Sequence, residues 1–221
     1  MGTVLAMIKQ FIIAAALGAV AGCAPDGDKK SLSERLMYSS APGFDHRNTL
    51  ETANALAQSG APALSIRVDK RAVNGVLFLL ESNYGYQAFL SSDNSMIVLK
   101  DGGLAATRGL GWDLISSDVS TLRSALMQRP EERPYQRRYR HLNGEDHVTE
   151  IVVGCVLTRR GQRSITVDEK PLRTMLHQEK CSNAQVSFQN LYWISQSGAK
   201  IIQSRQWAGQ GIGAIAIRRF D

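Results

Sequence analysis

Short stretches of alternating apolar and polar residues constrain the fold of this 221-residue chain more than any other feature. Leu64, Ile66 and Val68 alternate with polar side chains, which is the two-residue period of a strand with one buried face. Further apolar segments recur at intervals of about 8–12 residues. The sequence predicts strands or strand segments at 64–68, 76–80, 84–90, 96–99, 104–107, 135–142, 147–158, 164–167, 186–188, 192–194, 200–207 and 212–217.

Residues that favour turns lie between these segments. The sequence predicts turns at Asn74-Gly75, Ser91–Asn94, Asp101–Gly103, Asn143–Asp146, Arg160-Gly161 and Ser197-Gly198. Two other segments, Thr49–Gln58 and Asp118–Met127, contain good helix formers, and Ser117 or Asp118 is a suitable cap for the second. We therefore expect a mainly β protein, in which an antiparallel meander forms a sandwich or a barrel-like sheet, with one or two short helices.

The first 30 residues have the composition of an export signal followed by a polar tether. Lys9 precedes the apolar run Phe11–Val20, which is shorter than the roughly 20 residues that a membrane-spanning helix needs. Residues 20–23, Val-Ala-Gly-Cys, resemble a lipobox, where a signal is cleaved before a lipid-modified cysteine. An ordinary secretory signal cut near a cysteine is the alternative. The expected organisation is a signal peptide at 1–22, a lipidated tether at 23–30 and a single β-rich periplasmic domain at 31–221.

Lipid on Cys23 would attach the chain to a membrane, and Ala24 favours the outer membrane. In the lipoproteins that this segment resembles, aspartate at that position holds the protein in the inner membrane. We therefore expect an outer-membrane, lipid-anchored protein whose domain faces the periplasm. Its net charge of +6 does not require nucleic acid, and the periplasmic location disfavours such a partner. Anionic lipid headgroups or acidic sugars are more natural partners.

Two cysteines, Cys155 and Cys181, remain once lipid occupies Cys23. An even pair in an oxidising compartment predicts a disulfide. The alternative is that Cys155, which lies in the apolar segment Ile151–Leu157, is an unpaired buried thiol.

No pattern in the sequence identifies a catalytic, cofactor or metal site. Residues 209–213, Gly-Gln-Gly-Ile-Gly, do not open a helix as a dinucleotide loop does, so they predict a bulged or bent connection. His141, Glu145, Asp146 and His147 could ligate a metal, but a polar turn explains them better. No Gly-x-Ser-x-Gly motif supports a hydrolase nucleophile. We expect a non-enzymatic protein without a cofactor. The two carboxylates of a glycosidase can lie far apart in a sequence, so an unrecognised pair of catalytic carboxylates is the alternative.

The segment Arg129–Arg140 has five arginines and two tyrosines. Arginine binds carboxylate or phosphate, and tyrosine packs on sugar faces. In a strand, Arg138 and Arg140 would share one face, and Tyr135, Arg137 and Tyr139 the other. These five residues, with Tyr192, Trp193 and Trp207, form the candidate glycan surface. The alternatives are a charged strand edge that resists aggregation and three rings that face one another or fill the core.

Residues 188–193 (Phe-Gln-Asn-Leu-Tyr-Trp) and 204–207 (Ser-Arg-Gln-Trp), with 109–114 (Gly-Leu-Gly-Trp-Asp-Leu), resemble the YjbF/GfcB family of group 4 capsule and exopolysaccharide lipoproteins. The resemblance covers roughly residues 60–221 and provides no catalytic residues. It implies a mainly β outer-membrane lipoprotein that is a non-enzymatic accessory in capsule or exopolysaccharide assembly or export. The implied partners are an outer-membrane β-barrel or another polysaccharide-export protein, and an acidic polysaccharide. The alternative function is a periplasmic glycan-modifying enzyme with an unrecognised carboxylate pair.

Overall fold

The structure is a computed structural model that describes residues 55–71, 73–127, 134–142, 147–167, 170–198 and 200–220. The predicted signal peptide, the tether with Cys23 and the start of the predicted helix 49–58 lie outside these residues. Residues 55–58 are helical, which agrees with the end of that helix. The turn predicted at 143–146 also lies outside the described residues.

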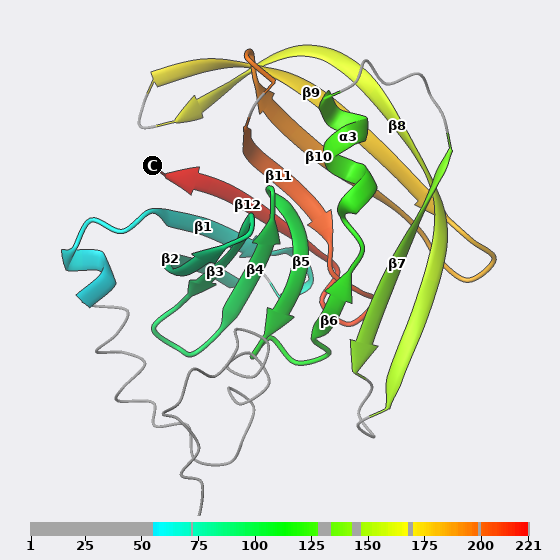
Figure 1. Ribbon diagram of the computed structural model, residues 1–221, viewed down its shortest axis with the longest axis horizontal. Helices are drawn as coiled ribbons and strands as arrows, with labels where there is room; N and C mark the ends of the chain where they lie inside the picture. Colours follow the sequence, from blue (N-terminus) through cyan, green and yellow to red (C-terminus); the bar gives the residue numbers. More distant parts are fainter. Residues whose placement is uncertain are drawn as a thin grey trace, which may run out of the picture. The chain divides into compact units, whose positions relative to one another are not determined.

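The fold is a single sheet of twelve antiparallel strands, as the alternating pattern predicted (Figure 1). The strands are β1 (Ala63–Val68), β2 (Val73–Asn83), β3 (Tyr86–Leu90), β4 (Met96–Lys100), β5 (Gly103–Arg108), β6 (Leu114–Ser117), β7 (Tyr135–Leu142), β8 (Val148–Val167), β9 (Lys170–Ser182), β10 (Ser187–Ser195), β11 (Ile201–Trp207) and β12 (Ala214–Phe220). Strands that are neighbours in sequence pair in the sheet, except that β5 and β6 are not paired and that β1 also pairs with β12.

The β1–β12 pairing turns the meander into a nearly closed barrel. The sheet begins at β5 and ends at β6, and these two strands are consecutive in the chain. They approach one another through side chains, since Ser117 Oγ donates to the Leu104 carbonyl and Arg108 Nη1 donates to the Leu114 carbonyl at 3.2 Å. Side-chain hydrogen bonds thus join the edge strands β5 and β6, between which there are no ladder hydrogen bonds. They limit the length of strand edge that is open to pairing with another chain.

The barrel interior holds the main core because alternate residues of each strand point inward. Leu64, Ile66 and Val68 are all buried, as their alternation predicted. Opposite them, residues of β7, β8, β9 and β11 complete the same cluster. A second buried cluster, with Ala88, Leu90, Met96 and Val98 among its members, lies on the other face of β3 and β4.

One helix, α3 (Ser120–Met127), follows β6 and packs one face against β8 and β10. Leu122 is buried against Leu157, Tyr192 and Ile194 of β8 and β10. Asp118 accepts a hydrogen bond from the Ser120 amide at 3.0 Å, so it satisfies a free donor at the helix start, as predicted. A short 3-10 turn, η1 (Asp69–Arg71), joins β1 to β2. No helix among the described residues is long and apolar enough to cross a membrane.

Two predicted turns are wrong because the glycines lie within strands. Gly75 is inside β2, opposite Ile66, and the reversal after β1 occurs earlier, at η1. Gly161 is inside the 20-residue β8, with φ of 93°, where the pairing with β9 shifts by one residue. A glycine in a strand marks such a bulge because it adopts positive φ without steric cost.

Candidate functional site

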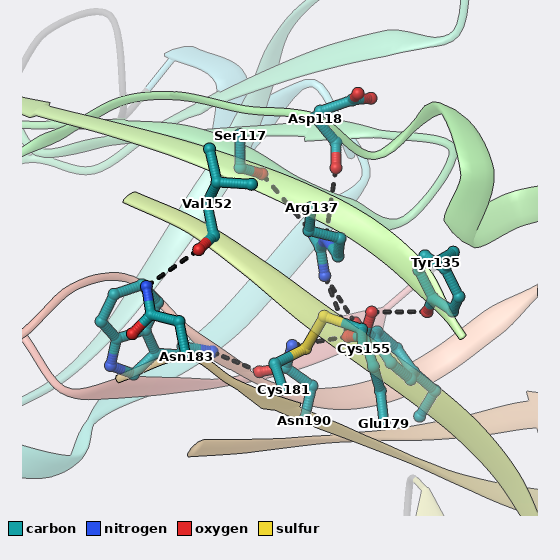
Figure 2. The surroundings of a disulfide bond; sticks show 12 residues. Ser117, Asp118, Tyr135, Arg137, Val152, Cys155, Glu179, Cys181, Asn183 and Asn190 are labelled. Atoms are coloured by element: carbon teal, nitrogen blue, oxygen red, sulfur yellow. Dashed lines mark hydrogen bonds and ion pairs between the residues drawn. A yellow bond between two sulfur atoms is a disulfide. The ribbon is translucent and has the colours of Figure 1, made fainter. Parts of the chain in front are cut away.

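The disulfide that the sequence predicted is present between Cys155 of β8 and Cys181 of β9 (Figure 2). The two residues are direct partners in the β8–β9 ladder, and both are buried. Their Cα atoms are 4.1 Å apart. This distance is slightly shorter than the usual range of about 4.4–6.8 Å for disulfide-linked residues.

A buried carboxylate, Glu179, lies two residues from Cys181 and on the same inward face of β9. Its side chain is 0% exposed and accepts four hydrogen bonds (Figure 2). Tyr135 and Tyr192 donate their hydroxyls at 2.5 and 2.9 Å, and Asn190 donates its amide at 2.6 Å. Arg137 Nη1 donates at 2.9 Å and forms an ion pair. We call these five residues the polar hub.

Arg137 extends the polar hub toward β6 and α3. Its side chain is 2% exposed, and its Nε donates to the Asp118 carbonyl at 3.1 Å. Asn190 extends the hub in the other direction, because its side-chain oxygen accepts the backbone amide of Trp207 at 2.7 Å. The hub therefore links β7, β9, β10 and β11 across the interior of the barrel. Each of its charges has a partner, which buried charges require.

The electrostatics of the polar hub hold Glu179 ionised. Burial alone would raise the pKa of Glu179, but Arg137 and the hydrogen bonds from Asn190, Tyr135 and Tyr192 outweigh burial, so the pKa is lowered. Burial and the neighbouring carboxylate raise the pKa of Tyr135. An ionised, buried carboxylate that already accepts four hydrogen bonds is suited to holding strands together. It is unsuited to donating a proton to a substrate.

A metal ion does not fit beside the polar hub. Sulfur atoms of Cys155 and Cys181 and a carboxylate oxygen of Glu179 lie within 4.8 Å of one another. Metal binding needs thiolates, and here both sulfurs are joined in the disulfide. Two members of the predicted polar turn are described: His141 is buried and bonded to the Ala208 carbonyl at 3.1 Å, and His147 is exposed.

The stability of the domain should decrease as the pH falls below about 4.5, the ordinary pKa of a glutamic acid. The folded-state pKa of Glu179 is lowered, so its ionisation stabilises the fold above that pH and is lost on protonation. Urea unfolding from pH 7 to pH 3 measures this effect. Glu179→Gln should flatten the pH profile, and a profile as steep as that of the wild-type protein would contradict the assignment.

The structure corrects half of the candidate glycan surface. The alternation within β7 is confirmed, but its inward face lies in the core and cannot contact a sugar. Four members are buried: Arg137, Tyr139, Tyr192 and Trp207. Tyr192 and Trp207 do not face each other across their strands, because they belong to different hydrophobic clusters. Trp207 stacks on Phe188 at 4.2 Å and meets Tyr139 edge-on at 5.0 Å.

The other members of the candidate glycan surface are partly or fully exposed. Arg138 and Arg140 point outward from β7, and both bind Glu150 of β8, at 3.0 and 2.9 Å. Two arginines that share one carboxylate have less charge to offer a ligand. The alternative of a charged strand edge does not hold either, because β7 lies between β6 and β8 in the sheet. Tyr135 and Trp193 are half-buried, and the Tyr135 hydroxyl is directed to Glu179.

Sequence reasoning missed Glu179 because it missed β9. The inward positions of β9 include Glu179 and His177, so the strand lacks the apolar alternation that reveals a buried face. One signal was available. In a strand, residues two apart share a face, so a buried disulfide at Cys181 places Glu179 beside it.

The fold and its interior define the class of this domain, an antiparallel β barrel with a buried disulfide and a buried ion pair. The chain belongs to the group 4 capsule polysaccharide lipoprotein family GfcB/YjbF, whose family model matches residues 35–220. The hypothetical lipoprotein YmcC from Escherichia coli K12 has a similar crystal structure, with a TM-score of 0.65 and 17% sequence identity. The match covers 88% of this chain and 98% of that one, and it supports the fold alone. No curated protein sequence matches the chain.

Proposed function

We propose that this protein is an outer-membrane lipoprotein that acts as a non-enzymatic accessory in capsule or exopolysaccharide assembly or export. Its domain faces the periplasm and docks onto an outer-membrane β-barrel or another export protein. The observation that carries this proposal is the family match over residues 35–220, because the family is described as capsule polysaccharide lipoproteins. The lipobox-like residues 20–23 and Ala24 support the anchor and its outer-membrane location.

The state of the acidic groups favours an accessory over a glycan-modifying enzyme. Glycoside cleavage generally uses two carboxylates that both reach the substrate. Glu179 is the buried carboxylate among the described residues, and its hydrogen bonds lie entirely within the polar hub. A shallow pocket beside α3 has Asp101 as its acid, but that side chain pairs with Arg123 at 3.3 Å and shares the pocket with Lys200.

Deletion of the gene tests the accessory role against the enzymatic one. We expect the deletion strain to carry less surface polysaccharide, with unchanged sugar composition and linkage, and the wild-type gene to restore the amount. A normal amount of polysaccharide with altered linkage or substituents would favour the enzyme. Normal amount and normal composition would reject both functions.

Replacing the predicted lipidation site by Cys23→Ala should prevent both lipid attachment and signal cleavage. Intact-mass analysis of the wild-type protein should show a chain that begins at Cys23 and carries acyl groups, since two or more chains anchor stably. The variant should retain residues 1–22 and no lipid. Ala24→Asp is the matched control: it should leave the lipid in place and move the protein to the inner membrane. A mature wild-type protein without lipid would contradict the prediction.

A further inference from the structure

Trp112 is an exposed tryptophan held in a strained backbone conformation. Its side chain is 62% exposed, whereas the Trp207 side chain is 8% exposed. Its φ is 61°, in the left-handed region that residues other than glycine rarely adopt. Strained residues of this kind cluster at functional sites such as ligand clamps.

Hydrogen bonds and a buried side chain hold the loop that carries Trp112 in place. Asp113 accepts hydrogen bonds from the Gly109 amide at 2.9 Å, the Leu110 amide at 3.2 Å and the Thr107 hydroxyl at 2.8 Å. Leu110 is buried in the main core. The ring is therefore presented by a rigid turn, so its ordering costs little when a ligand binds.

The glycine-rich connection between β11 and β12 forms the seat for this ring. A Cβ atom on Gly211 would lie 2.5 Å from Trp112 Cγ, so the indole packs directly on the glycine backbone. A Cβ atom on Gly213, whose φ is 79°, would lie 2.8 Å from the Lys70 side chain. Residues 209–213, predicted as a bent connection, thus accommodate an aromatic side chain and a cationic one.

Two cations bind the backbone next to the residues that carry and seat the ring. Lys70 Nζ donates to the Gln210 carbonyl, and Arg71 Nη2 donates to the Gly111 carbonyl at 3.4 Å. Asp69, the acidic neighbour in η1, is already paired with Arg205 at 2.6 Å. Among the described residues, Lys70 and Arg71 have no carboxylate partner, and both are exposed. The Trp112 patch, which comprises Trp112, Lys70 and Arg71, is therefore a flat aromatic face with positive charge at its edge.

We propose that the Trp112 patch binds an acidic polysaccharide, with one sugar ring stacked on the indole and its carboxylate beside Lys70 or Arg71. Indole faces pack well against apolar ring faces, and both cations favour an anionic group. This inference rests on the proposed function for the choice of ligand. The patch lies at the end of the barrel where β1 ends.

Isothermal titration calorimetry tests the proposal. The ligand is size-fractionated surface polysaccharide from the producing bacterium, and the protein is the non-lipidated form with the Cys155–Cys181 disulfide intact. We expect Trp112→Ala and Trp112→Asn to weaken binding about tenfold, and Trp112→Tyr to retain most of it. Asn tolerates positive φ, so this variant separates loss of the ring from loss of the turn. Gly211→Ala, which displaces the ring, should weaken binding as well. Lys70→Gln/Arg71→Gln should weaken binding and reduce its salt dependence.

The charge-matched control is Arg138→Gln/Arg140→Gln, which removes two positive charges from another face and should leave affinity unchanged. Wild-type affinity in Trp112→Ala, or no binding by the wild-type protein, would overturn the proposal. Trp112-dependent binding to phosphatidylglycerol vesicles without binding to polysaccharide would overturn it in favour of a membrane contact. Full complementation of the deletion strain by Trp112→Ala would reject the patch and leave the accessory role standing, whereas a deletion strain without a phenotype would reject that role itself.

Discussion

Replacing Arg137 by methionine should destabilise the domain by about 3–5 kcal/mol, because it leaves the carboxylate of Glu179 buried without its cation. Methionine fills much of the volume of the aliphatic part of the arginine side chain. The decrease in stability therefore reflects the unpaired charge of Glu179 more than a cavity. Urea or thermal unfolding at pH 7 measures the change. The equivalent change on the exposed face, Arg140→Met, should cost less than about 1 kcal/mol, since exposed ion pairs contribute little.

The double variant Arg137→Met/Glu179→Gln separates burial of charge from packing. Removing both charges should recover at least about 2 kcal/mol of the loss, because the amide oxygen of the introduced glutamine can still accept from Asn190 and Tyr192 while its NH2 group donates to the Tyr135 hydroxyl. The pH dependence should also become shallower in Arg137→Met. The pKa of Glu179 would lie closer to its ordinary value, because burial would then be opposed only by the hydrogen bonds from Asn190, Tyr135 and Tyr192. A loss below 1 kcal/mol in Arg137→Met would show that the ion pair is not required.

The strands that could be predicted from the sequence are those whose buried side chains are apolar. Apolar residues alternate with polar ones in β1 and are concentrated in β12. The observed strands, Ala63–Val68 and Ala214–Phe220, overlap the predicted segments 64–68 and 212–217. β7 was also predicted, and its two faces were separated correctly. The sequence could not decide which face of β7 lies in the core, because arginine occupies both inward and outward positions. Only the pairing of Arg137 with Glu179 makes a buried arginine tolerable, and that pairing depends on the missed strand β9.

The same reasoning explains why the Trp112 patch was not visible in the sequence. Its three members come from η1 and the β5–β6 loop, and their seat comes from the β11–β12 connection. These segments are about 40 and 100 residues apart in the chain, and they meet because the β1–β12 pairing brings the two ends of the meander together. Alternation and turn signals report local structure, so they cannot place loops from distant strands side by side.

Removing the disulfide should cost about 3.5 kcal/mol, which is the chain-entropy value for the 26-residue separation of Cys155 and Cys181. That loss is a large share of the roughly 5–15 kcal/mol by which domains are usually stable. For a domain of this size it corresponds to a decrease in Tm of about 10 °C. Urea unfolding of the oxidised and the reduced wild-type protein measures this difference in stability without any change of sequence.

The double variant Cys155→Ala/Cys181→Ala tests how the disulfide and the polar hub interact. Both sulfurs are buried beside Glu179, so the alanine variant loses packing as well as the cross-link and should be less stable than the reduced protein. The disulfide and the Arg137–Glu179 ion pair restrain neighbouring residues of β9. The decreases in the free energy of unfolding caused by Arg137→Met and by reduction of the disulfide should therefore not be additive. Two alkylatable thiols in wild-type protein unfolded without reductant would show that the bond does not form. Equal stability of the oxidised and reduced proteins would show that it forms without holding the β8–β9 pair in place.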